Sequence, residues 1–257
     1  MIATKFPPDS PLVSDVVPSP NHGERRGVIR PEIILLHYTG MADAEVALTR
    51  LCQPGGEVST HYFVYEDGRL VQCVPEERRA WHAGESSWAG MDDINSRSVG
   101  IEIVNPGHGL GYADFPDAQI ATVIALVGDI AVRQRIAPHR ILAHSDVAPV
   151  RKQDPGEKFP WWRLAAAGAA LWVAPEPISE LGAALKLGDR GNEVLALQNG
   201  LAEYGYGIPM NGEYDGATEA VVTAFQRHFR PARVDGVADV STCKTLARLL
   251  ATHADGA

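Results

Sequence analysis

The sequence predicts an α/β domain, with a central mixed β-sheet flanked by helices, followed by a small domain of three helices. Up to residue 174, short apolar runs rich in branched residues alternate with segments of helical spacing, which is typical of a sheet with helices on its faces. Proline and small residues interrupt this pattern at 175–182, and only helical spacing recurs beyond them. A chain of 257 residues is long enough for one medium and one small domain.

The elements of the first domain can be assigned in order along the chain. Residues 1–30 are rich in proline and lack periodicity, so we expect an extended arm. The run EIILLHYTG indicates a buried strand that carries His37 at its end, and the runs on either side of Asp67 and Gly68 indicate a hairpin. The remaining expected elements are a helix at 43–53, a strand at 98–107, a helix at 115–136, a strand within 140–147 that ends at His144, and a helix at 159–173.

The second domain is expected to consist of amphipathic helices at 189–205, 215–229 and 237–250. The last two are introduced by similar phrases, MNGEYDGATEAV and RVDGVADVSTCKTL, which indicates a weak internal duplication. The predicted organisation is therefore an arm at 1–30, a first domain at 31–174, a linker at 175–182 and a second domain at 183–252. Because the linker separates the two domains, we expect separate cores, so that residues 1–178 would fold alone.

Composition excludes several classes of function. The formal net charge is −9, whereas nucleic-acid binding depends on clustered Lys and Arg, so no nucleic-acid partner is expected. Cys52, Cys73 and Cys243 lie far apart and form no CxxC pair, which argues against a disulfide framework or a thiolate zinc site and favours free thiols, although a pair that meets in space stays open. No run reaches the roughly 20 apolar residues that span a bilayer. Residues 1–20 contain no apolar signal-peptide core, so the sequence predicts a cytoplasmic location.

Three residues of the first domain suit a metal ion. His37 follows the apolar run ILL, His144 follows ILA, and Asp154 lies ten residues further on. Two neutral imidazoles and one carboxylate are a common ligand set of catalytic zinc, with the fourth position left for water. If the two strands run parallel, both histidines emerge at one edge of the sheet, where α/β domains build their sites. The alternative is a pair of hydrogen-bonded core histidines with a surface aspartate.

The first domain resembles a known family. The segments IILLHYTG, VSTHYFVYEDGRLVQCVPEERRAWHAG and LAHSDVAPVRKQDPGEKFPWWRL are similar to the zinc-dependent N-acetylmuramoyl-L-alanine amidases of the second amidase family, which are related to phage amidase-type lysozymes and animal peptidoglycan recognition proteins. The likeness covers about residues 19 to 172. Residues 183 to 251, with LKLGDRGNEVLALQNGLAEYGY, resemble a peptidoglycan-binding module. The resemblance implies an amidase catalytic domain that acts on peptidoglycan or muropeptides, followed by a module that tethers it to the polymer.

The resemblance also implies roles for individual residues. His37, His144 and Asp154 match the family's zinc ligands, for one ion per chain. Glu102, in GIEIVN, matches a carboxylate that faces the metal-bound water, and Lys152 matches a cation near the reacting carbonyl. These roles suit amide hydrolysis, because zinc lowers the pKa of water to about 7, a carboxylate can move the proton, and a cation stabilises the tetrahedral oxyanion.

Each further candidate has a structural alternative. Glu102 could lie on a solvated sheet face, and Lys152 could be an exposed loop lysine. His61 and His82 are candidates either for substrate contact or for structural hydrogen bonds, and Asn95 either for substrate contact or for a turn. We expect surface positions for four other histidines and a core role for the two tryptophans at 161 and 162; these histidines are His108, His139, His228 and His253.

Two other functions compete with the amidase hypothesis. A non-catalytic peptidoglycan recognition protein would be favoured by loss of a zinc ligand, and none is missing. A zinc hydrolase that acts on another amide is disfavoured by the peptidoglycan-binding module. That module also points to the periplasm or cell envelope as an alternative to the cytoplasm. A monomer is expected, and the choice between anhydro-muropeptides and intact peptidoglycan stays open.

Overall fold

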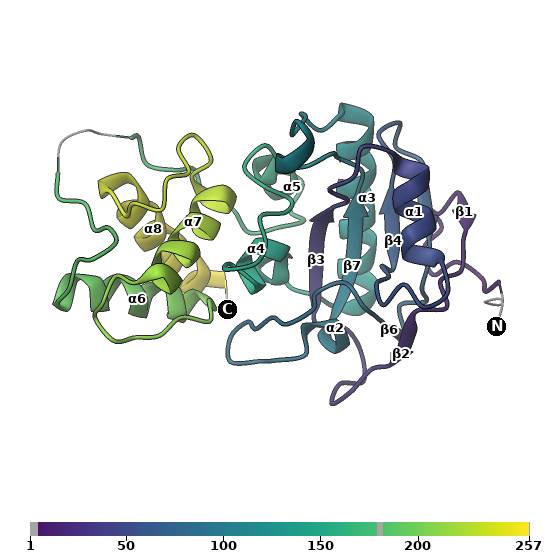
Figure 1. Ribbon diagram of the computed structural model, residues 1–257, viewed down its shortest axis with the longest axis horizontal. Helices are drawn as coiled ribbons and strands as arrows, with labels where there is room; N and C mark the ends of the chain where they lie inside the picture. Colours follow the sequence, from purple (N-terminus) through teal and green to yellow (C-terminus); the bar gives the residue numbers. More distant parts are fainter. Residues whose placement is uncertain (1–4, 179–181, 257) are drawn as a thin grey trace.

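A six-stranded sheet forms the centre of the computed structural model, which describes residues 5–178 and 182–256. Its order is β1-β5-β4-β7-β3-β8 (Figure 1). The β4 and β5 strands are antiparallel, and the other neighbours run parallel, so the predicted mixed sheet is confirmed. The strands are β1 (Asp15–Val16), β3 (Ile33–Tyr38), β4 (Tyr62–Val64), β5 (Leu70–Gln72), β7 (Ser98–Ile103) and β8 (Ile141–Ala143).

The central strand β3 lies between β7 and β8 and is parallel to both. Its apolar run, residues 33–36, is completely buried, as expected for a strand covered on both faces. In the register of these strands, His37 lies opposite Glu102, and Leu36 lies opposite Ala143, the residue before His144. The carboxyl ends of β3 and β8 therefore meet at one edge of the sheet.

Helices cover both faces of the sheet. Side chains of α1 (Ala44–Cys52) pack against Phe63 and Val71, whereas those of α3 (Asp117–Gln134) pack against Tyr62 and Val64. Since Phe63 alternates with its neighbours along β4, the two helices lie on opposite faces, and Figure 1 shows α1 in front of the sheet and α3 behind it. The shorter helices of this domain are α2 (Ile94–Arg97), α4 (His144–Val147), α5 (Trp161–Ala166), η1 (His108–Leu110) and η2 (Pro138–Arg140).

The N-terminal arm contains two short strands that the sequence did not predict. The β1 strand extends the main sheet beside β5, and β2 (His22–Glu24) pairs antiparallel with β6 (Arg78–Ala80). Arg25 then donates hydrogen bonds to the carbonyls of Ser96 and Ser98. Such pairing partners lie far away in the sequence, so local composition could not predict them. Residues 1–4 of the arm and 179–181 of the expected linker lie outside the described residues.

The strand expected to end at His144 and the helix expected at 159–173 both end earlier than predicted. The strand expected to end at His144 ends at Ala143, because His144 is already the first residue of α4. The carboxylate of Asp146 accepts the Ala143 N–H at 2.8 Å, which starts this turn. The α5 helix stops at Ala166, because Gly168 adopts a positive φ and Ala169 donates back to the Leu164 carbonyl.

The C-terminal region folds into the expected helices α6 (Asn192–Tyr204), α7 (Gly216–Phe229) and α8 (Val240–Gly256). Gln198 of α6 accepts the N–H groups of the turn at 211–212, and Gln226 of α7 accepts those of the turn at 235–236. The two arrangements are equivalent, and they support the predicted internal duplication.

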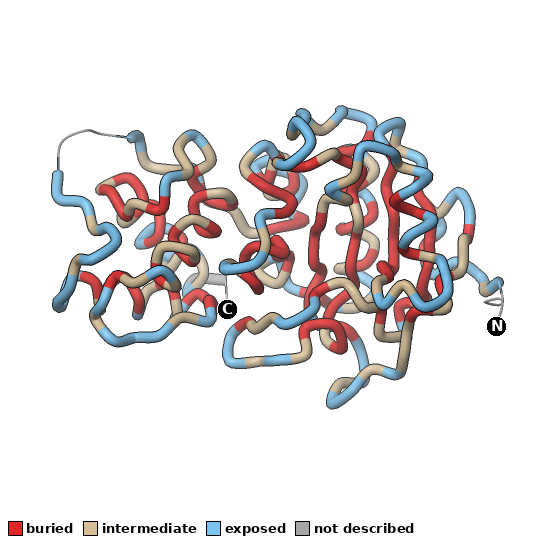
Figure 2. The backbone as a smooth tube through the Cα atoms, in the orientation of Figure 1, coloured by how far each residue is buried: buried red, intermediate tan, exposed pale blue. Residues whose placement is uncertain are grey.

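The two regions share one hydrophobic core, so the expectation of separate cores is wrong. A single buried cluster includes Ile33 and Leu35 of the sheet together with Phe225 and Leu249 of the C-terminal helices. Figure 2 shows buried backbone on both sides of the junction. The contact joins Trp88, in a loop, and the short helices α4 and α5 to the C-terminal helices. These segments lie far apart in the sequence, so local periodicity does not predict the contact.

Trp88 is a buried aromatic contact of this junction. It is 2% exposed and packs edge-to-face on Tyr204 and Tyr206, with ring centroids 5.4 and 5.0 Å away. The next residue, Ala89, donates to the carbonyl of Gly205 at 2.7 Å. Gly205 has a φ of +136°, and a Cβ there would lie 2.6 Å from the Trp88 ring. Glycine is thus required for the two segments to approach so closely.

The remaining expectations about aromatic side chains had mixed outcomes. Trp161 is buried, as predicted, but Trp162 is 56% exposed. His228, expected at the surface, is 1% exposed and lies in the junction. The other three histidines of that group are partly buried. Within the described residues, no helix is both long and apolar enough to cross a membrane.

The junction makes a testable prediction about stability. Trp88→Ala should lower the free energy of unfolding by about 3 to 5 kcal/mol, because it removes a fully packed aromatic side chain. Trp162→Ala, the same change at an exposed site, should alter it by about 0.5 kcal/mol or less. Urea unfolding of both variants measures the difference. Equal losses would mean that the junction contributes little to folding.

Candidate metal centre

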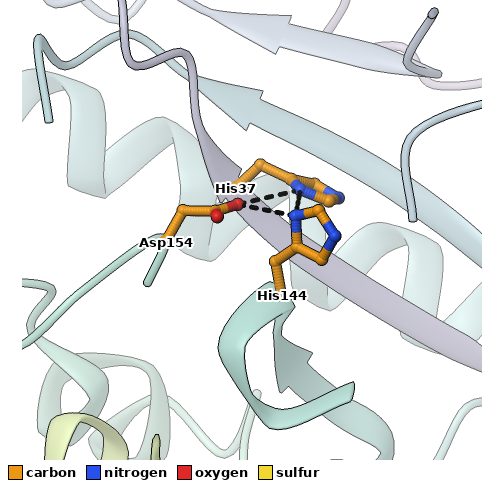
Figure 3. A group of neighbouring side chains, drawn as sticks. All are labelled: His37, His144 and Asp154. Carbon is orange, nitrogen blue, oxygen red and sulfur yellow. Dashed lines mark hydrogen bonds and ion pairs between the residues drawn. The ribbon is translucent and has the colours of Figure 1, made fainter. Parts of the chain in front are cut away.

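His37, His144 and Asp154 converge at the edge of the sheet where β3 and β8 end (Figure 3). His37 is the fifth residue of β3, His144 begins α4 directly after β8, and Asp154 lies in the loop that follows α4. Ser145 N–H donates to the carbonyl of Asp154 at 3.0 Å, which ties this loop to α4. The parallel strands therefore bring together residues that are up to 117 positions apart in the sequence.

The three side chains present one nitrogen or oxygen atom each to a common point. The Nδ1 atoms of His37 and His144 lie 2.8 Å apart, and Asp154 Oδ2 lies 3.1 and 2.9 Å from them. Zinc ligands in a tetrahedron with distances of about 2.0 to 2.1 Å are separated by roughly 3.3 Å. The observed triangle is only a few tenths of an ångström tighter, so a small outward movement would admit an ion.

The outer nitrogens of both imidazoles are also held in place. His37 Nε2 lies 3.0 Å from Nδ1 of His82, and His144 Nε2 lies 3.0 Å from the carbonyl oxygen of Ala83. Asn95 Oδ1 in turn accepts the backbone N–H groups of His82 and Ala83, both at 2.8 Å. Metal-binding histidines usually have such outer partners, which fix the ring orientation and leave the inner nitrogen free for the ion.

The protonation states of the group suit a cation. Burial, followed by the nearby His144, lowers the pKa of His37 to about 4, so its ring is neutral at pH 7. Burial by itself would raise the pKa of Asp154, but the charge and hydrogen bonds of His144 and His37 hold it well below the usual value. The neutral ring of His37, the second imidazole of His144 and the carboxylate of Asp154 form a donor set of two nitrogens and one oxygen, which fits zinc.

Glu102 and Lys152 line the same cavity as His37, His144 and Asp154, and its volume is about 410 Å³. The Glu102 side chain extends from β7 beside His37, and its Oε2 atom is buried with no hydrogen-bond partner among the described residues. Burial, together with the negative charge of Asp154, raises the pKa of Glu102 well above its usual value. Lys152 opposes this shift through its positive charge. A carboxyl group of raised pKa in a cavity is well suited to proton transfer.

The other sequence candidates lie in different surroundings. His82 lines the cavity, but His61 and Asn95 do not line it. His61 is fully buried: its Nδ1 accepts Gly100 N–H, and its Nε2 lies 3.0 Å from the Arg78 carbonyl oxygen. Asn95 holds the loop at 82–83, as described above. The structure thus brings His82 to the metal group and gives His61 and Asn95 structural hydrogen bonds.

Several cavity residues were not singled out from the sequence. Trp81, Arg50 and Arg151 also line the cavity. Trp81 precedes His82 directly, so its place in the AWHAG segment was an available signal. Arg50, in the last turn of α1, follows the ordinary pattern of a basic residue near a helix end and carried no such signal.

Comparisons with known proteins agree with this geometry. A family model described as N-acetylmuramoyl-L-alanine amidase matches residues 27–157, and a model of a peptidoglycan binding domain matches residues 190–246. The N-acetylmuramoyl-L-alanine amidase AmiD of Escherichia coli K12 is 37% identical, over 83% of this chain and 80% of the relative. The 1,6-anhydro-N-acetylmuramyl-L-alanine amidase AmpD of Citrobacter freundii is 30% identical, over 58% of this chain and 87% of the relative.

Solved structures are similar over both regions. Escherichia coli AmiD, in complex with anhydro-N-acetylmuramic acid-L-Ala-D-γ-Glu-L-Lys, superposes with a TM-score of 0.73 at 32% identity, covering 92% of this chain and 99% of that one. AmpDh3 of Pseudomonas aeruginosa, in complex with anhydromuramic pentapeptide, has a TM-score of 0.72 at 29% identity, covering 91% and 95%.

His61 makes a testable prediction about acid stability. Burial, followed by Arg25, lowers the pKa of His61 well below its ordinary value of about 6.5, and protonation of Nδ1 would break the bond from Gly100. The unfolded chain therefore takes up a proton that the folded chain does not. Stability from this residue is complete above pH of about 6.5 and falls below it, by up to about 1.4 kcal/mol per pH unit.

The measurement is urea unfolding as a function of pH. In His61→Asn, an amide oxygen can still accept the Gly100 bond, but the group no longer titrates. This variant should lose part of the acid sensitivity of the parent. If both proteins lose stability with the same slope, the depressed pKa of His61 does not contribute.

Proposed function

This chain belongs to the N-acetylmuramoyl-L-alanine amidase family, and we propose that it is a zinc-dependent member that hydrolyses the amide bond between N-acetylmuramic acid and L-alanine in muropeptides or peptidoglycan. The observation that carries this proposal is the convergence of His37, His144 and Asp154 in a cavity that also contains Glu102 and Lys152. All the groups that metal-assisted amide hydrolysis needs are thus present around one space.

The protein side chains have separate tasks in this reaction. His37, His144 and Asp154 would hold zinc, which supplies a water of lowered pKa and polarises the amide carbonyl. Glu102 takes the proton of the attacking water and delivers it to the leaving amine of L-alanine. Lys152 provides positive charge where the carbonyl oxygen becomes negative. His82 contacts the outer nitrogen of His37 and so holds the His37 ring in its orientation. In this proposal, His82 orients a metal ligand and does not contact substrate.

The proposed substrate class is a muramoyl peptide with an anhydro or reducing-end sugar. The solved complexes of AmiD and AmpDh3 contain anhydromuramic peptides, which supports the same class for this chain. The C-terminal region, matched by the peptidoglycan binding model, supports polymer as a further substrate. Soluble muropeptides would be met in the cytoplasm and intact polymer in the cell envelope, so cell fractionation tests the compartment. The proposed oligomeric state is a monomer.

Metal removal tests the zinc hypothesis. Dialysis against a strong chelator should abolish release of L-alanine-terminated peptide from an anhydro-muropeptide, and stoichiometric zinc should restore it. Replacing His37, His144 or Asp154 by alanine should remove metal and activity together, because an open three-ligand site has no spare donor. A folded wild-type protein that binds muropeptide but releases no peptide with zinc present would instead be a recognition protein.

The roles of Glu102 and Lys152 make a separate prediction. Glu102→Gln should keep zinc and the fold but lower kcat by about 10² to 10⁴, as for loss of a general base. Lys152→Ala should lower kcat by about 10² to 10³, as for loss of an oxyanion donor. Steady-state kinetics with a soluble muropeptide, together with metal analysis, test both. Turnover at the parent rate in either variant would refute the role of that residue.

A further inference from the structure

A buried carboxylate joins the helix of the metal ligand to the C-terminal region. Asp146, the third residue of α4, is completely buried. Its Oδ2 atom accepts the backbone N–H of Ala143 at 2.8 Å, and the Nδ1 atom of His228 lies 2.8 Å from the same oxygen. Its Oδ1 atom accepts the hydroxyl of Tyr206, also at 2.8 Å. Two of these three partners therefore come from beyond the linker.

His228 is held in the orientation that this contact requires. Its ring stacks between Trp161 and Phe229, with centroid distances of 3.7 and 3.9 Å. Its Nε2 atom has no hydrogen-bond partner among the described residues, so Nδ1 is the nitrogen that carries the proton and donates to Asp146. Trp161 belongs to the first domain and Phe229 to α7, so this stack lies in the junction itself.

The α4 helix determines the position of two proposed metal ligands. His144 is its first residue, and the N–H of Ser145 holds the carbonyl of Asp154 at 3.0 Å. Asp146 in turn fixes Ala143, which pairs with Leu36, the residue directly before His37. Figure 1 places α4 between β3 and the C-terminal helix α7, and α4 packs against both elements.

We propose that Tyr206 and His228 are positioning residues for the metal centre, acting through Asp146 on the α4 backbone and so on His144 and Asp154. This inference rests on the proposed zinc-dependent amidase function. The C-terminal region would then shape the active site as well as bind polymer. The physical reason is that a buried carboxylate without donors draws in water or moves toward other partners. Either response shifts α4, and ligand positions matter on a scale of about 1 Å.

The size of the expected effect follows from outer-shell partners of metal ligands, whose loss typically costs about 10- to 100-fold in metal affinity or activity. Tyr206 and His228 contact Asp146 instead of a proposed metal ligand, so their effect on the ligands is less direct. We therefore expect Tyr206→Phe to weaken zinc binding about 10-fold and to lower kcat by a similar factor. KM should stay within about twofold, because Tyr206 is not among the residues that line the catalytic cavity.

Matched variants separate positioning from general destabilisation. Tyr204→Phe is the control for Tyr206→Phe, since Tyr204 packs on the same Trp88 ring but does not bond Asp146. For His228, the pair is His228→Leu and His228→Asn. Both lose the aromatic stack, but the amide nitrogen of Asn can still donate to Asp146 in place of Nδ1. His228→Asn should therefore recover zinc affinity that His228→Leu loses.

The experiment measures zinc affinity by competition with a fluorescent chelator, well below the unfolding temperature, alongside kcat and KM on an anhydro-muropeptide. Weaker zinc binding and lower kcat in Tyr206→Phe and His228→Leu, with parent values in Tyr204→Phe, support the proposal. Parent zinc affinity in Tyr206→Phe, or the same loss in Tyr204→Phe, would overturn it. A wild-type protein that binds zinc but hydrolyses no muropeptide would refute the proposed function, and the zinc affinities would still test the positioning.

Discussion

The parallel pairing of β3 with β7 and β8 is the constraint on which the site depends. It places His37 opposite Glu102 and Leu36 opposite Ala143. His144 comes directly after Ala143 and therefore lies beside His37, where the strands end. Backbone hydrogen bonds between three buried strands fix these relations, and a slip by one residue would turn His37 to the other face of the sheet. His37 and His144 meet because the carboxyl ends of β3 and β8 lie side by side, and the loop after α4 adds Asp154.

At this edge of the sheet, burial shifts the pKa of a histidine and the pKa of a glutamate in opposite directions. It lowers the pKa of His37 and raises that of Glu102, whereas Asp154 stays ionised because two imidazoles face it. The same low-polarity environment thus provides a neutral nitrogen donor at His37, a charged oxygen donor at Asp154 and a carboxyl group of raised pKa at Glu102. Such a division of properties among neighbouring residues is typical of catalytic sites.

The junction joins the C-terminal helices to this edge of the sheet. Trp88 provides an apolar contact, and Asp146 provides a polar contact whose partners come from both regions. Buried polar groups with all their partners favour one arrangement over others, because each alternative leaves a donor or acceptor without a bond. The two regions are therefore expected to keep a fixed relation, with the polymer-binding region held next to the ligand helix α4.

The sequence by itself predicted the central strands, the main helices and the grouping of His37, His144 and Asp154. Apolar runs at 33–36 and 141–143 predicted buried strands, and a histidine at the end of each predicted a shared edge, since these features are local and periodic. Only the tertiary structure decided that Asn95 and His61 make structural bonds, that β1 and β2 pair with distant strands, and that His228 is buried against Asp146. These depend on contacts between residues far apart in the chain, many of them in loops. Such contacts leave no periodic pattern in the sequence, because the environment of a loop residue depends on which segments pack against it in the fold.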